Sequence, residues 1–128
     1  MKEAKIHEFD PVIYPRLLWV CANSTKQALV ERFEINEKQT EESLEINGVT
    51  TTLVSDLETK KHGILVFCTS KKQLTISNIA HESVHVADAI FEAIQAVGED
   101  FSVGNEPFAY LVGWAAGCMN QVRINKFK

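Results

Sequence analysis

Two histidines and a glutamate stand at a spacing that can hold a metal ion beside a base. His81-Glu82-Ser83-Val84-His85 has the pattern His-Glu-x-x-His. Helix residues four apart share one face, so both imidazoles can reach a single ion. Glu82 points about 100° around the axis from His81, where it can contact a metal-bound water without being a ligand. Zinc lowers the pKa of such a water to about 7, and a carboxylate can take its proton. The pattern therefore predicts Zn2+ held by His81 and His85, with Glu82 as general base.

A metal site of this kind needs a further donor from outside the motif, because catalytic zinc has three protein ligands and one open position. Glu106 stands at the start of the next predicted helix, beyond a loop at 98–104 that lets the two helices pack side by side. We therefore expect Glu106 to be the third ligand. Asp88 and Asn105 are candidate hydrogen-bond partners of the zinc-bound imidazoles. Their alternatives are a solvated helix carboxylate and a simple N-cap.

The spacing of apolar residues places the motif on a helix of a small α+β domain. From Ile79 to Ile94 apolar residues recur every three or four positions, which predicts a helix over about 77–97. Apolar and β-branched runs predict strands, and capping residues predict two more helices. The predicted strands are 12–21, 49–56 and 63–69, and the other predicted helices are about 24–33 and 106–121. We expect a small, mainly antiparallel sheet packed against helix 77–97, in a single domain covering 1–128.

The segments between these elements carry weaker signals. The stretch 34–47 is polar and acidic, which predicts a solvated loop or an exposed short strand. Strands 49–56 and 63–69 are expected to form a hairpin. Segment 64–69 has two readings: an edge strand that pairs with an extended substrate, or a central strand, which its unbroken apolar run favours. Asp56 is expected to be a solvated surface residue.

Composition excludes several other classes of protein. The chain has 128 residues, of which 45% are hydrophobic and 23% charged, and its formal net charge is −4. These values are ordinary for one soluble domain, and no basic stripe for nucleic acid is present. No apolar run reaches the length of a membrane helix, and the first residues do not resemble a secretory signal. Cys21, Cys68 and Cys118 are widely separated, which predicts buried free thiols in the cytoplasm.

A second sequence feature gives the motif a family resemblance. The stretch Asn105-Glu106-Pro107-Phe108-Ala109, following His81 to His85, resembles the gluzincin metallopeptidases, whose second helix carries a glutamate ligand that is often preceded by asparagine. The metzincin alternative would have glycine and histidine where this chain has Asp88 and Phe91. The short chain and its run from Glu106 to Leu111 also resemble small zincin-like proteins of bacterial phages and prophages. The resemblance covers roughly 77–114.

This resemblance implies a zincin-like fold and a peptidase activity. His81, His85 and Glu106 would hold Zn2+, and Glu82 would activate the water that attacks the peptide bond of a peptide or protein substrate. Gluzincin peptidases stabilise the oxyanion with a tyrosine or histidine, and Tyr110 stands one helical turn after Glu106. The alternative for Tyr110 is an ordinary half-buried tyrosine.

Two other functions compete with the peptidase. In the first, the same three ligands hold zinc in a non-catalytic binding or regulatory module, encoded by a phage or prophage. In the second, the two histidines bind no metal and the chain is a structural protein. Substitution of Glu82 by glutamine separates catalysis from zinc binding, and metal analysis separates both zinc proteins from the metal-free one.

Overall fold

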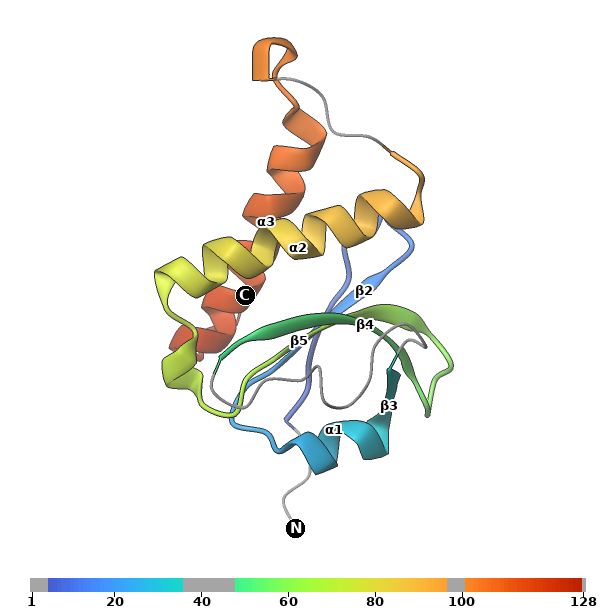
Figure 1. Cartoon of the computed structure of the whole chain (residues 1–128), viewed down its shortest axis with the longest axis vertical. Coiled ribbons are helices and arrows are strands. Elements are labelled where there is room, and N and C mark those ends of the chain that lie inside the picture. The colour runs from blue at the N-terminus through green and yellow to red at the C-terminus, as the bar shows by residue number, and fades with distance from the viewer. Residues whose placement is uncertain (1–4, 36–47, 97–100, 128) are drawn as a thin grey trace.

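The computed structural model has an α+β architecture with a five-stranded mixed sheet and three helices (Figure 1). It describes residues 5–35, 48–96 and 101–127. In chain order the elements are β1 (His7–Phe9), β2 (Leu17–Cys21), α1 (Lys26–Arg32), β3 (Phe33–Ile35), β4 (Thr50–Asp56), β5 (His62–Phe67), the 3-10 turn η2 (Lys71–Gln73), α2 (Ile76–Ala93), the 3-10 turn η3 (Phe101–Val103) and α3 (Glu106–Ile124).

The sheet has the strand order β1-β2-β5-β4-β3. The predicted β4–β5 hairpin is confirmed, with Thr50 opposite Phe67 and Ser55 opposite His62. β1–β2 and β3–β4 also pair in antiparallel fashion, whereas β2 and β5 run parallel. The sheet is therefore mainly antiparallel, as expected, but mixed. β5 lies between β2 and β4 and is buried along most of its length, so the edge-strand reading of this segment is wrong.

The first predicted strand begins too early. Val12 lies in a turn, where its N–H donates to the Asp10 carboxylate at 2.8 Å and its φ is 67°, so the strand starts only at Leu17. β1 was not predicted, because three residues show too little alternation to be recognised. β3 supplies a short strand at the start of the polar stretch, and the predictions for 36–47 lie outside the described residues.

Two layers of helix cover the two faces of the sheet. Alternate residues of β2 point to opposite sides: Leu18 and Val20 pack with α2 and α3, whereas Trp19 and Cys21 pack with α1. α2 lies across one face of the sheet and α3 packs against α2, with α1 on the opposite face (Figure 1). Trp19 is fully buried. A Cβ on Gly63 would lie 2.4 Å from the Trp19 ring, so glycine is required there.

The helix that carries the motif is slightly shorter than predicted. Thr75 is the N-cap of α2, because its side chain accepts the Asn78 N–H, and the helix begins at Ile76. α2 ends at Ala93, before the predicted limit of 97. α3 starts with Glu106, as predicted, and continues to Ile124. Within the described residues, none of these helices combines the length and the apolar character that crossing a membrane requires.

Candidate metal site

The structure brings His81, Glu82 and His85 together on α2. One ligand atom from each lies within 4.8 Å of the others, and this is the group of potential metal ligands found among the described residues. The two Nε2 atoms are 3.2 Å apart. A tetrahedral zinc ion with Zn–N bonds of about 2.0–2.1 Å separates its two nitrogens by about 3.3 Å. The imidazoles are thus spaced as two ligands of one zinc ion, a distance that also suits a hydrogen bond between the rings.

Helical periodicity explains why these side chains share a face. The residues of α2 that point away from the groove are apolar or small, and they are buried against the sheet and α3: Ile79, Ser83, Val86, Ala87, Ile90 and Phe91. Ser83 is accommodated there because its hydroxyl donates to the Ile79 carbonyl. His81 and His85 occupy the more exposed side of the helix, and the His81 side chain is 69% exposed. A dissolved ion can therefore reach them.

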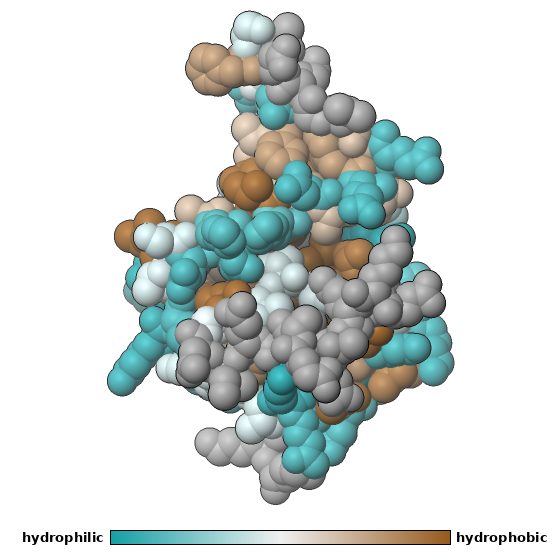
Figure 2. Space-filling view, in the orientation of Figure 1, coloured by the Kyte–Doolittle hydropathy of each residue, from teal (hydrophilic) through white to brown (hydrophobic). Residues whose placement is uncertain are grey.

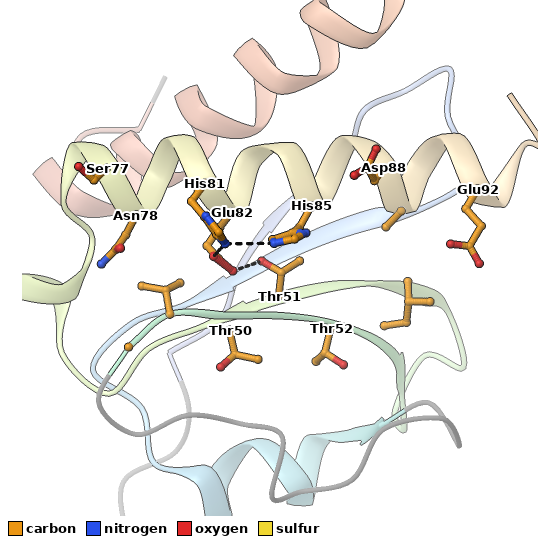
Figure 3. A pocket seen from close by; sticks show the side chains of 14 residues that line it. Thr50, Thr51, Thr52, Ser77, Asn78, His81, Glu82, His85, Asp88 and Glu92 are labelled. Carbon is orange, nitrogen blue, oxygen red and sulfur yellow. Dashed lines mark hydrogen bonds and ion pairs between the residues drawn. The ribbon is translucent and has the colours of Figure 1, made fainter. Parts of the chain in front are cut away.

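Glu82 lies deeper than the two imidazoles. It is only 6% exposed, between α2 and β4. Its Oε1 accepts a hydrogen bond of 3.0 Å from the Thr51 hydroxyl, and its Oε2 is 3.7 Å from His81 Nε2 (Figure 3). One carboxylate oxygen is therefore fixed by the strand, while the other faces the imidazoles. A general base beside a metal-bound water requires this kind of placement.

The three residues open onto a groove of about 750 Å³ between β4 and α2. One wall comes from β4 and the residues just before it, and the other comes from one face of α2. Asp88 and Glu92 continue the α2 wall beyond His85, and the described residues that line the groove include no lysine or arginine. Hydrophilic residues cross the middle of the face shown in Figure 2, where α2 crosses the molecule. The groove is therefore lined largely by polar side chains and is open to solvent.

The structure does not bring Glu106 into this group. Glu106 is exposed at the first turn of α3, and among the described residues it belongs to no cluster that could hold a metal. The same turn of α3 is anchored by Phe108, whose ring packs edge-on against Phe91 with centroids 5.2 Å apart. Phe91 lies ten residues after His81, about 15 Å along the helix axis. The start of α3 therefore lies beside the far end of α2, and the role of Glu106 as a ligand stays a prediction.

Tyr110 also lies outside the group. It is 74% exposed and lines a separate apolar groove with residues from the segment before β2, Ile13 among them. Asp88 lines the metal-site groove, but its carboxylate is turned away from β4 (Figure 3). Asn105 is the N-cap residue of α3 in the left-handed conformation, without a side-chain capping bond. The oxyanion role of Tyr110 thus has no support from its position.

One prediction about a carboxylate is wrong. Asp56 is fully buried rather than solvated, and it accepts hydrogen bonds from Arg32 Nε at 2.9 Å and Nη2 at 3.0 Å. The N–H of Glu58 donates to it at 2.9 Å. The hydrogen bond from Arg32 is the largest of the causes that lower the pKa of Asp56 to about 2. The sequence shows that Asp56 ends a strand just before a turn, where aspartate often caps backbone N–H groups. It does not show that its ion-pair partner is Arg32, which lies 24 residues earlier.

The residue that sequence reasoning missed at the site is Thr51. Period-2 alternation along β4 assigns Thr51 and Leu53 to one face and Thr52 and Val54 to the other, but does not say which face meets α2.

The three cysteines are free and buried, as predicted. No family model matches the chain, and no curated protein or solved structure shows significant similarity to it. Its function therefore has to be inferred from the geometry of the site.

Proposed function

We propose that His81 and His85 bind Zn2+ and that the protein is a zinc-dependent peptidase of zincin-like architecture, with Glu82 as its general base. The observation that carries this proposal is the 3.2 Å separation of the two Nε2 atoms, with the Glu82 carboxylate beside them. Two imidazoles are two of the three protein ligands that catalytic zinc requires, and the open groove gives the ion access to solvent. The helix that bears them lies across one face of the sheet.

Bound zinc would supply a Lewis acid and a water of lowered pKa. The residues of the chain would supply metal binding and proton transfer. His81 and His85 would hold the ion through their Nε2 atoms. Glu82 accepts the proton of the attacking water on the oxygen that faces His81, and later donates it to the leaving amine. Two protein ligands leave two coordination positions of a tetrahedral ion, one for water and one for a further donor.

Two carboxylates are candidates for that further donor. Asp88 follows His85 by one turn and lines the same groove, but its carboxylate is turned away from β4 and would have to rotate to reach the ion (Figure 3). Glu106 is implied by the gluzincin resemblance, but lies at the first turn of α3. The groove suits a peptide because it is open to solvent and lies between a strand and a helix. Buried free thiols fit a reducing compartment, so we place the activity in the cytoplasm.

Metal analysis combined with two variants tests the proposal. Protein purified without added metal should contain about one zinc per chain, and His81→Ala should lose it. Glu82→Gln should keep zinc and lose turnover of quenched fluorescent peptides. Zinc without turnover in the unaltered protein would instead identify a non-catalytic zinc module, and absence of zinc from both proteins would contradict the metal site altogether.

A further inference from the structure

We infer that Thr51 is a positioning residue for Glu82, an inference that rests on the proposed function. The Thr51 hydroxyl donates to Oε1 of Glu82 at 3.0 Å, so the second oxygen of the same carboxylate faces His81 Nε2 at 3.7 Å. A carboxylate has two equivalent oxygens and rotates about its last bond. A donor that holds one oxygen determines where the other points.

The sheet makes Thr51 a rigid donor. It lies in β4, paired with Val66 of the central strand β5, and Val66 is buried. The branched Cβ of threonine further restricts rotation of its side chain. α2 is held against the same face of the sheet by the apolar cluster that includes Val66 and Val86. The donor and the carboxylate are thus carried by two elements that pack against each other, and neither side chain depends on a loop.

Burial of the Glu82 carboxylate makes its orientation depend on this hydrogen bond. Glu82 is 6% exposed, so little bulk water reaches its carboxylate. A hydroxyl that donates to a carboxylate forms a charge-assisted hydrogen bond, which is stronger than one between neutral groups. Without the hydroxyl, Oε1 would lose its donor, and the carboxylate would rotate away from the direction that proton transfer requires. A misplacement of about 1 Å can lower the rate of a catalytic step by roughly 100-fold.

The inference predicts a specific kinetic pattern. Thr51→Val keeps the shape of the side chain and removes the donor, so it should lower kcat by about 10- to 100-fold. KM and zinc affinity should each stay within about twofold, because the hydrogen bond of the Thr51 hydroxyl goes to Glu82 and not to an imidazole. Thr51→Ser keeps the hydroxyl and should recover most of kcat, which a purely structural role of the methyl group would not allow.

Thr52 supplies a matched control on the same strand. Thr52 also borders the groove, but its side chain points away from α2 and is 3% exposed (Figure 3), and its hydroxyl has no hydrogen-bond partner among the described residues. Thr52→Val therefore removes a buried hydroxyl that makes no such bond, and it should change neither kcat nor zinc affinity. If Thr52→Val lowers kcat as much as Thr51→Val does, the effect belongs to the strand as a whole and the inference is wrong.

A double-mutant cycle measures the contact without any activity assay. In metal-free protein, Thr51→Val should lower Tm by about 4 °C when Glu82 is present, and by much less when Glu82 is leucine. Equal shifts in the two backgrounds would overturn the contact. An active protein whose Thr51→Val variant keeps full kcat would overturn the positioning role alone. A protein without zinc or turnover would overturn the proposed function, and the role of Thr51 with it.

Discussion

Two buried carboxylates lie along β4, on opposite faces of the sheet, and they are partnered very differently. Asp56, at the end of the strand on the side of α1, is fully buried, and both oxygens of its carboxylate accept hydrogen bonds from Arg32. Glu82 packs over the other end of the strand, where Thr51 donates to one oxygen. Its second oxygen faces the imidazoles and the groove.

This difference separates a carboxylate that stabilises the fold from one that is placed to act as the proposed general base. The acceptor capacity of Asp56 is occupied by a guanidinium and by backbone N–H groups, so no reactant can reach it and the interaction serves folding. Glu82 retains an oxygen that a water in the groove can approach, which a general base requires. Burial of a carboxylate is therefore a poor guide to function by itself. What matters is whether one of its oxygens remains unpaired and faces a groove.

The largest effect is expected from substitution of a proposed zinc ligand, near the Thr51 end of β4. His81→Ala removes one of two imidazoles and should lower zinc affinity at least about 100-fold, because a single histidine leaves the ion weakly held. Competition with a chromophoric chelator measures the change. His62→Ala is the control, since His62 is an exposed histidine whose Nδ1 pairs with the Ser55 hydroxyl. Similar losses in both variants would mean that zinc binds nonspecifically.

At the other end of β4, substitution of Asp56 should lower the stability of the fold and change how that stability depends on pH. Asp56→Asn should lower the free energy of unfolding at pH 7 by about 2 kcal/mol, because the folded pKa of about 2 lies below the unfolded value of about 3.9. A lowered folded pKa contributes stability above the unfolded pKa, and the contribution is lost as the pH falls toward 2. Urea unfolding of both proteins should therefore converge between pH 4 and pH 2. A constant difference would contradict the ion pair.

A smaller effect is expected when the reactive carboxylate is neutralised. Glu82→Gln keeps the acceptor for Thr51 and removes a buried charge, so the free energy of unfolding should change by less than about 1 kcal/mol in either direction. Urea unfolding of metal-free protein is the measurement. A loss as large as that of Asp56→Asn would show that Glu82 is structural too, and would remove the contrast between the two carboxylates.

The smallest effect is expected at the start of α3. Glu106→Gln should change zinc affinity by less than about threefold, because Glu106 lies outside the group formed by the two imidazoles and Glu82. Asp88→Asn, on the face of α2 that lines the groove, is the informative partner variant. A loss of affinity in Glu106→Gln comparable to that of His81→Ala would show that α3 supplies the third ligand after all.

Sequence reasoning was reliable where the answer depended on neighbours along the chain. The helix that carries His81 and His85, the hairpin of β4 and β5, and the start of α3 at Glu106 are confirmed within a few residues. Periodicity, capping and turn residues depend on neighbours within one or two turns, so they can be recognised from the sequence alone. The parallel pairing of β2 with β5 was not foreseen, since it joins residues more than 40 positions apart.

The convergence of His81, Glu82 and His85 was determined by the sequence itself, because the geometry of an α-helix leaves residues four apart on one face whatever surrounds them. Only the tertiary structure decided what those residues meet. It set Thr51 beneath Glu82, gave Asp56 its arginine, and docked the first turn of α3 beside Phe91 rather than beside His81. Such placements depend on how whole elements bury their apolar faces, and that is a property of the assembled core.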